Sequence, residues 1–520
     1  MTTVSRRSAM RRATAFPAAM GVVVGALVTG LIVPFAVGDD ATVGTASTFD
    51  ARSGGSGDDL SGSTSGSGSG PLDDGTATST VDTGGGSTAP SSPGVSRSAP
   101  TGGGAPGTGT GRLASDVGVT PATIKLGIVL LDLATANTVG LAPDHYEIET
   151  QRKAYQAHID AINAAGGIHG RTIEAVYAVA DPFNPDTAIA ACNSLTEDHK
   201  VFMASVFAGY TADGMLCVAQ THRTPLVVFG WPPDEHFQKT EGRMVSDGMA
   251  ANRIMFNWVH ELDRMRLIQG KTIGIVADED TSNGDKQAVD QGLLPALRQY
   301  GYKAAYRTRL SDDLHTAASQ IPLEVQRMRA AGVDTVMLPT TFLYATQWVQ
   351  NAESQGWRPQ YHVSDLQGLT CDVCVEDMPS SFHGAYGITD RHFIRGAREG
   401  MPEPEPDRRC RETYNRATGE SWKYGDRHPL YNTCVQIELV RRTLLAAGEN
   451  PTRVRWTAGA RSAGDFPLAT AYGGGLNGKT DYSDVVVTIR WDTECKDSPQ
   501  TSDTEEDCYR TIDEPRRTRY

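Results

Sequence analysis

Hydrophobic residues in the larger, C-terminal part of the chain recur with two spacings, which predict alternating strands and helices. Short apolar runs such as TIKLGIVLL, which begins at Thr123, are typical of strands buried on both faces. Between such runs apolar residues return every three or four positions, as at Tyr155, Ile159 and Ile162, and this spacing is typical of helices with one buried side. The alternation predicts two successive βα arrays, each with a parallel sheet between helices, and therefore the α/β fold class.

The same pattern predicts the extent of each element. The expected strands of the first array are 123–131, 172–179, 201–206 and 225–229, and those of the second are 271–277, 303–306, 334–339 and 360–363. Helices are expected at 148–165, 249–263, 285–300, 315–331, 345–355 and 430–447. The chain is expected to close with strands near Pro467 and at 484–491, followed by a disordered tail at 511–520.

The N-terminal segment 1–38 has the pattern of an export signal or a membrane anchor. Four arginines within the first twelve residues precede 26 uncharged residues at 13–38, and basic residues at this position hold the N-terminus in the cytoplasm. The rest of the chain is therefore expected on the extracellular side of the cell membrane, anchored or secreted. Both outcomes stay open, because Ala36-Val37-Gly38 fits a cleavage site, whereas the apolar run is long enough to span a bilayer.

Residues 39–112 form a linker of unusual composition. They hold 19 of the 55 glycines in 74 positions and very few large apolar side chains. Such a segment cannot bury enough apolar surface to offset the entropy of ordering it, so it is predicted to be disordered. As a flexible tether it would have a root-mean-square span of about 45 Å. The folded part of the chain is expected to begin near Arg112.

Composition excludes several classes of function. A formal net charge of −14 leaves no surplus of Lys and Arg for phosphates, so a nucleic-acid partner is excluded. The 12 histidines form no HExxH motif and no close cluster with carboxylates, so neither a metal nor a cofactor is expected. The folded region has no GxSxG motif, which leaves the hypothesis of a cell-envelope hydrolase without support.

One motif imitates a phosphate-binding loop. Residues 473–480 read GGGLNGKT and match that pattern letter by letter, with Lys479 and Thr480 in the expected places. A phosphate-binding loop must open a helix whose N-terminus holds the phosphates, but residues 484–491 alternate like a strand. A hairpin turn is therefore predicted at this position.

All eight cysteines lie beyond the linker, which fits an oxidising compartment and about four disulfides. Eight cysteines allow 105 pairings, and the simplest hypothesis joins neighbours along the chain. The CxxC at Cys371 and Cys374 has no second CxxC and no helix pattern after it, which favours a structural bridge over a zinc or redox site. The neighbour pairs are Cys192 with Cys217, Cys371 with Cys374, Cys410 with Cys434, and Cys495 with Cys508.

The order of several short motifs resembles one family of proteins. GVTPATIKLGIVLLD, INAAGGIHGRTIE, TPLVVFG, KTIGIVADED, AGVDTVMLPTT and NAESQGWRPQY follow one another in the expected order. Over residues 119–492 the chain resembles the leucine/isoleucine/valine-type extracellular solute-binding proteins of ABC importers, which have the type I periplasmic-binding fold. The resemblance implies two Rossmann-like lobes with parallel sheets, joined by three hinge crossings near Asp247, Gly387 and Gly464. One lobe would hold 119–247 with 390–464, and the other 250–386 with 466–510.

The same resemblance implies a ligand site between the lobes, on loops that follow the strands. Two loops where the family's amino-acid binders keep small residues hold Tyr210 and Trp231 here, and Asp365 lies where the family often keeps an acid for an ammonium group. A ligand with an amine or amide group and an apolar or ring portion is therefore expected. The candidate contacts are Asp132, Tyr210, Thr211, Gly230, Trp231, Asp280, Thr341, Phe342 and Asp365.

The resemblance also implies a binding protein without enzymatic activity. It would capture a small organic solute outside the membrane and deliver it to the permease of an ABC transporter. The N-terminal segment would contact the membrane. The same fold is used in receptor ectodomains, so a membrane-tethered sensor that signals to a partner protein remains the alternative.

Overall fold

The computed structural model describes residues 111–134, 147–182, 184–207, 210–279, 285–375, 378–426, 430–492 and 507–520. The predicted signal or anchor, most of the linker, Asp280 and Cys495 lie outside these described residues. Among the helices of the described ranges, none combines the length and apolar character that a membrane span requires.

The first sheet has five parallel strands in the order β2-β1-β3-β4-β5. These strands are β1 (Thr123–Leu131), β2 (Thr172–Ala180), β3 (Met203–Val206), β4 (Leu226–Val228) and β5 (Met244–Ser246). β1 pairs with β2 on one side and β3 on the other, and its residues from Leu126 to Leu131 are all buried. This burial on both faces explains why the strand is a continuous apolar run.

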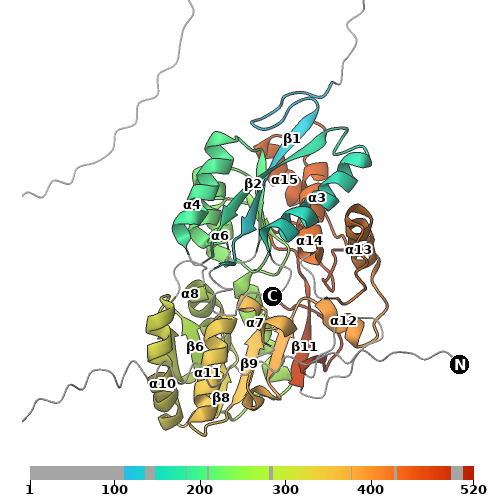
Figure 1. Ribbon diagram of the computed structural model, residues 1–520. Helices are drawn as coiled ribbons and strands as arrows, with labels where there is room; N and C mark the ends of the chain where they lie inside the picture. Colours follow the sequence, from blue (N-terminus) through green and yellow to red (C-terminus); the bar gives the residue numbers. More distant parts are fainter. Residues whose placement is uncertain are drawn as a thin grey trace, which may run out of the picture. The chain divides into compact units, whose positions relative to one another are not determined.

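Helices from two distant parts of the chain cover the first sheet. The N-terminal set is α3 (Ile148–Ala164), α4 (Pro185–Asn193) with η1 (Ser194–Asp198), α5 (Ala212–Leu216) with η2 (Cys217–Thr221), and α6 (Asp234–Lys239); the C-terminal set is α13 (Glu405–Thr418), α14 (Leu430–Ala446) and α15 (Arg453–Ala460). α14 packs beside α3 and α13 (Figure 1). Buried Gln436 of α14 accepts hydrogen bonds from Tyr155 and Ser205 at 2.5 and 2.8 Å and donates to the Val206 carbonyl oxygen. These bonds attach the C-terminal helices to the first sheet.

The second sheet follows the order β12-β11-β10-β9-β8-β6-β7, and β13 also pairs with β11. Its parallel strands are β6 (Ile273–Asp278), β7 (Ala304–Leu310), β8 (Thr335–Met337), β9 (Gln360–Ser364) and β10 (Tyr386–Thr389). The antiparallel strands are β11 (Val485–Asp492), β12 (Cys508–Thr511) and β13 (Arg516–Arg517). The sheet is therefore mixed rather than wholly parallel.

The second sheet carries its own helices. They are α7 (Ala251–Arg264), α8 (Asp285–Gln287) with η3 (Ala288–Leu293) and α9 (Leu294–Gln299), α10 (Leu314–Ala330), α11 (Phe342–Ser354), α12 (Phe393–Arg398), and the short turns η4 (Leu366–Gly368), η5 (Asp372–Cys374) and η6 (Ser380–Phe382). α10 and α11 pack side by side (Figure 1). α11 begins three residues before the expected start, because the Thr341 side chain accepts a hydrogen bond from the Tyr344 amide and caps the helix.

Two expectations for the C-terminal part differ from the structure. The strand expected near Pro467 is absent from residues 461–484, which instead form isolated bridges such as Asp465 with Gly475. Phe466, Leu468 and Tyr482 are buried in the core of the first sheet, although the sequence placed this segment in the second lobe. Much of segment 461–484 therefore packs with the first sheet before the chain enters β11.

The tail expected to be disordered at 511–520 is ordered in the structure. β13 pairs with β11, and the amide of Arg519 donates to Asn257 Oδ1 at 3.1 Å. The ring of Tyr520 lies 5.1 Å from that of Phe256 on α7. The tail is polar and lacks apolar periodicity, so its order depends on contacts with distant residues that no local pattern shows.

Three of the neighbour pairs expected from the sequence are disulfides in the structure. Cys192 with Cys217, Cys371 with Cys374, and Cys410 with Cys434 have Cα atoms 6.2, 5.2 and 5.8 Å apart. The first pair joins α4 to η2, and the third joins α13 to α14. Cys508 is also disulfide-bonded, while its expected partner Cys495 lies outside the described residues.

Candidate functional site

The carboxyl ends of the parallel strands are acidic. Five such strands form the first sheet, and β6 to β10 form the parallel part of the second. Ligands of α/β proteins bind outside the carboxyl ends of parallel strands, which makes the residue after each strand informative. All ten positions lie in the described residues. Six of them hold an acid, and none of them holds Lys or Arg. The acids are Asp132, Asp181, Asp247, Glu279, Asp365 and Asp390.

Aromatic side chains occupy the strand ends between these acids in the first sheet. Phe207 follows β3 and Phe229 follows β4, and their rings stack with centroids 5.2 Å apart. Trp231 meets Phe229 edge-on at 6.1 Å and also packs against the core of the second sheet. The buried indole Nε1 of Trp231 has no hydrogen-bond partner among the described residues. A buried indole N–H usually finds a partner, so this donor is unused among the described residues.

Tyr210 and Thr211 hold the first lobe together in this structure. The Tyr210 hydroxyl donates to the Ala188 carbonyl oxygen on α4 at 2.7 Å, and its ring lies against Gly214. Burial raises the pKa of Tyr210. Thr211 caps α5, since its hydroxyl accepts from the Gly214 amide at 3.3 Å. Both side chains are directed to their own lobe rather than to the strand ends of the second sheet.

A buried ion cluster links the strand ends of the two sheets. Arg391 lies 3.2 Å from Asp247 Oδ2 and 3.1 Å from Asp390 Oδ1, and none of the three side chains is exposed. The Arg391 guanidinium also lies over the Phe229 ring at 5.6 Å. Gly230, with φ +124°, donates its amide to Asp247 Oδ1 at 2.9 Å. The candidate Gly230 is therefore attached to this cluster.

Asp365 joins the same cluster from the end of β9. Its Oδ2 accepts from the Asp390 amide at 2.6 Å, and its Oδ1 accepts from the Thr370 hydroxyl. Burial, followed by the charge of Asp390, raises the pKa of Asp365 to about 8. Burial likewise raises the pKa of Asp247 to about 6. Asp365 is therefore largely protonated at neutral pH, which limits the negative charge buried beside Arg391.

The other second-sheet candidates lie at the start of α11. Asp278, the last residue of β6, accepts from the Thr341 amide at 3.0 Å and from the Thr340 hydroxyl. Phe342 is partly buried against the core of this sheet. In the first sheet, Asp132 is half-buried and accepts from the Ala134 amide at 2.9 Å. Asp280 lies outside the described residues.

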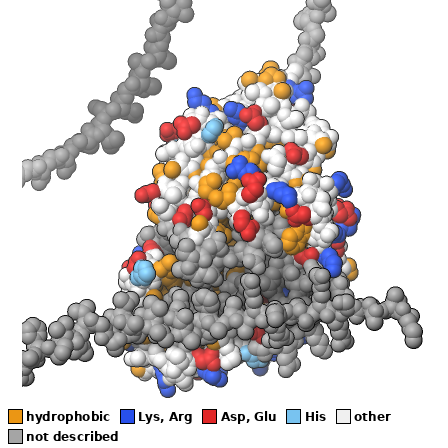
Figure 2. Space-filling model, viewed as in Figure 1, with side chains coloured by type: hydrophobic (Ala, Val, Ile, Leu, Met, Phe, Trp, Pro, Cys, Tyr) orange, Lys and Arg blue, Asp and Glu red, His pale blue; other side chains and the backbone are white. Residues whose placement is uncertain are grey.

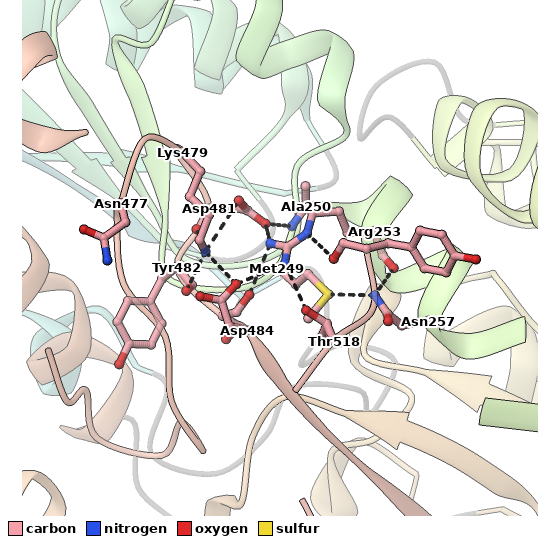
Figure 3. Close-up of polar contacts among 12 residues, drawn as sticks. Met249, Ala250, Arg253, Asn257, Asn477, Lys479, Asp481, Tyr482, Asp484 and Thr518 are labelled. Atoms are coloured by element: carbon pink, nitrogen blue, oxygen red, sulfur yellow. Dashed lines mark hydrogen bonds and ion pairs between the residues drawn. The ribbon is translucent and has the colours of Figure 1, made fainter. Parts of the chain in front are cut away.

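Three segments link the two sheets, and hydrogen bonds join them to one another. These segments are 247–250, 390–404 and 471–484. Asp390 Oδ2 accepts from the Met249 amide at 3.0 Å, and Asp481 Oδ2 accepts from the Ala250 amide at 2.9 Å. Figure 3 shows Asp481 and Asp484 directed at Arg253 of α7. Asp390 and Asp481, which come from two distant segments, thus bind backbone amides at the N-terminal end of α7.

Asp481 supplies an N-terminal cap that α7 lacks in its own sequence. The N-cap position is Ala250, whose side chain cannot accept a hydrogen bond. We expect Asp481→Ala to lower the free energy of unfolding by about 2 kcal/mol, because it removes the cap and the nearest partner of Arg253. Urea unfolding measures this loss. The control Asp313→Ala removes the exposed cap of α10, and an equal loss in the two variants would contradict a linking role for Asp481.

The motif that imitates a phosphate-binding loop belongs to this network. Lys479 Nζ donates to the carbonyl oxygens of Asp481 and Tyr482 and lies 3.1 Å from Asp484 (Figure 3). The Gly475 amide donates to the Tyr482 carbonyl oxygen at 3.0 Å, which closes a turn. Strand β11 follows instead of a helix, so the predicted hairpin turn is the observed structure.

The structure brings together some of the predicted site residues and adds others. Gly230, Trp231 and Asp365 gather around the ion cluster, and Thr341 with Phe342 form a second group at Asp278. Sequence reasoning missed several members of both groups. Most of the missed residues lie at or directly after the end of a strand, and this position in the sequence could have identified them. The missed residues are Phe207, Phe229, Asp278, Asp390 and Arg391.

Comparison with known proteins places this geometry among binding proteins. Residues 146–481 match the family described as periplasmic binding protein. No curated protein matches the chain. A fatty acid ABC transporter substrate-binding protein from Thermomonospora curvata is 18% identical, with a TM-score of 0.54 over 76% of this chain and 94% of its own.

Two further solved structures are similar. An ABC transporter substrate-binding protein from Desulfitobacterium hafniense in complex with Leu is 12% identical, with a TM-score of 0.51 over 71% of this chain and 97% of its own. A solute-binding protein of an ABC transporter from Rhodopseudomonas palustris HaA2 in complex with p-hydroxybenzoic acid is 15% identical, with a TM-score of 0.55 over 76% and 97%. At these identities the likeness shows the fold.

Proposed function

Because the chain belongs to the periplasmic binding protein family and has its type I fold, we propose that it captures a small organic solute between its two lobes for an ABC importer. The family binds solutes and does not transform them. The partner of the loaded protein would be the transporter permease. We place the folded part on the extracellular side of the cell membrane, attached or released according to the fate of segment 1–38.

The acids at the strand ends carry the proposal for the ligand class. Asp132, Asp181 and Glu279 lie at strand ends outside the Arg391 cluster, so the field at this edge favours a cation or a hydrogen-bond donor over an anion. Trp231 and Phe342 add apolar surface from opposite sheets. We therefore infer a ligand with an amine or amide group and an apolar portion. Two of the similar proteins are described with a fatty acid or with p-hydroxybenzoic acid. These ligands are organic acids, whose ionised form is negative, whereas an amine is positive and an amide is neutral.

The contacts that we infer are fewer than the sequence predicted. Trp231 offers its free indole N–H from the first lobe, and Thr341 with Phe342 face the ligand from the second. Asp132 would meet the ligand at the end of β1. Asp365 acts through the ion cluster, and Tyr210 and Thr211 keep the roles in packing and capping described above.

A thermal-shift screen of the oxidised protein tests the ligand class. Primary amines, polyamines, carboxamides and amino acids form one arm, and aromatic and aliphatic acids form the other. A ligand present at about a hundred times its dissociation constant adds about 2.7 kcal/mol of stability, so an amine or amide is expected to raise Tm by several degrees. A shift only with organic acids would contradict the ligand class, and no shift in either arm would contradict solute capture.

A further inference from the structure

Exposed aliphatic side chains gather where the chain enters its described part. Five large hydrophobic residues are exposed in the described ranges, and three of them are Leu113, Val117 and Val454, with 59%, 47% and 80% of their surface exposed. Leu113 and Val117 precede β1, and Val454 lies in the first turn of α15. We call residues 112–122 and 449–455 together the entry face.

Hydrogen bonds hold the two segments of the entry face together. The Leu113 amide donates to Asn450 Oδ1 at 2.8 Å, and the Arg453 amide donates to Asp116 Oδ2 at 2.7 Å. Ser115 Oγ donates to the Pro451 carbonyl oxygen at 2.6 Å. The three aliphatic side chains are therefore presented by one connected surface. Ala114, Pro121 and Ala122 on this surface are exposed as well.

Arginine residues lie next to these aliphatic residues in the sequence. Arg112 and Arg455 are exposed, while Arg453 is partly buried. The acids of the entry face are Asp116, which is held by the Arg453 amide, and exposed Glu449. Figure 2 shows hydrophobic side chains flanked by Lys or Arg at the upper end of the view, over the turn that precedes β1 in Figure 1. The surface therefore combines aliphatic groups with a small excess of positive charge.

We propose that the entry face rests on the anionic headgroups of the membrane to which segment 1–38 attaches this chain. The inference rests on that attachment and goes beyond solute capture. The chain enters the described part at Gly111, next to the entry face in the sequence, so residues 39–111 connect the apolar segment 13–38 to this surface. Two binding segments in one chain meet at a raised effective concentration, which allows weak contacts to form.

The chemistry of the entry face suits lipid better than a protein partner. Its exposed apolar residues are aliphatic, and none of the residues in these two segments is aromatic. Protein interfaces are enriched in aromatic anchors. Arginine donates several hydrogen bonds to phosphate, and basic residues near an anionic leaflet add to membrane affinity. A few small aliphatic groups give only marginal membrane binding alone, which fits a surface that a tether already holds nearby.

Hydrogen exchange of the full chain in vesicles tests this proposal. The chain is reconstituted in phosphatidylcholine vesicles with and without phosphatidylglycerol, and the detergent-solubilised chain is the reference. We expect amides in 113–119 and 450–457 to exchange several-fold more slowly in anionic vesicles. The effect should be lost in Leu113→Ser/Val454→Ser and kept in Leu323→Ser, whose side chain is exposed to a similar extent on α10. Thermal melting of each variant checks that it is folded.

Three different outcomes would overturn the proposal that the entry face rests on the membrane. Equal exchange in vesicles and detergent would overturn the proposal. Slower exchange that depends on protein concentration in detergent would overturn it too, because a second copy would then cover the entry face. A chain that does not float with the vesicles lacks the attachment, which also overturns it. None of these outcomes alters the solute screen, so failure here is separable from failure of solute capture.

Discussion

Replacing Arg391 by methionine is expected to lower the free energy of unfolding by about 3–5 kcal/mol, because it leaves two buried carboxylates without a counter-charge. Asp247 and Asp390 lie 3.2 and 3.1 Å from the guanidinium, and none of the three side chains is exposed. Methionine keeps an unbranched side chain over the Phe229 ring while removing the charge. Urea unfolding at neutral pH measures the loss.

Two further variants separate the buried pairing from a general effect of losing an arginine. Arg409 on α13 pairs with Glu405 at 3.5 Å but is 45% exposed, so Arg409→Met is expected to change stability by less than about 0.5 kcal/mol. Adding Asp247→Asn and Asp390→Asn to the Arg391→Met protein should recover much of its loss, since no charge is then buried unpaired. A triple variant no more stable than the single variant would contradict the account.

The stability of the protein is expected to fall as pH rises toward 8, because Asp365 loses its proton in the interior. Its pKa is raised to about 8 by burial and by Asp390, whereas an aspartate in an unfolded chain titrates near about 4. Between these values the folded state binds more protons than the unfolded state. This single group therefore lowers the free energy of unfolding by up to about 1.4 kcal/mol per pH unit, and its effect levels off above pH 8.

Asp365→Asn isolates this effect. An asparagine cannot ionise, yet its side-chain oxygen can still accept from the Asp390 amide as the carboxyl does. Burial raises the pKa values of Asp247 and Asp407 to about 6 and about 7. Their ionisation therefore also lowers the free energy of unfolding as pH rises, but in a lower pH range. The variant should therefore lose the slope between pH 7 and 8 and be more stable than the natural protein at pH 8.5.

The matched control for this experiment is Asp313→Asn. Asp313 caps α10 at an exposed position, and asparagine is an equally good cap, so the pH dependence between 7 and 8 should not change. Urea midpoints across this range give the slopes. Identical slopes for the natural protein and Asp365→Asn would show that Asp365 does not hold a proton in the folded state.

The sequence predicts the buried strands well, because their signal is local. β1 is apolar on both faces, so its run of hydrophobic residues marks it without knowledge of its neighbours. The start of α11 is set by the Thr341 cap rather than by apolar spacing, and the expected helix began three residues too late. The tail at 511–520 gives no periodic signal because its order comes from β11 and α7.

The candidate site is predicted less completely, because its parts are joined over long distances in sequence. In the sequence, Tyr210 and Trp231 are both aromatic residues in loops that follow strands. In the structure, Tyr210 donates a hydrogen bond to α4, whereas Trp231 packs against Phe229. Their different directions depend on packing that the sequence does not show. Arg391 is part of the site only because Asp247, 144 residues earlier in the numbering, lies beside it. Such ion pairs leave no local pattern.

The central claim is that a small solute binds between the two lobes at the carboxyl ends of both sheets. Hydrogen exchange of the oxidised protein tests it directly, with and without the amine or amide that gives the largest thermal shift. We predict slower exchange in two regions at once, residues 229–234 after β4 and residues 340–345 at the start of α11. Slower exchange in only one of these regions, or in neither, would contradict capture between the lobes.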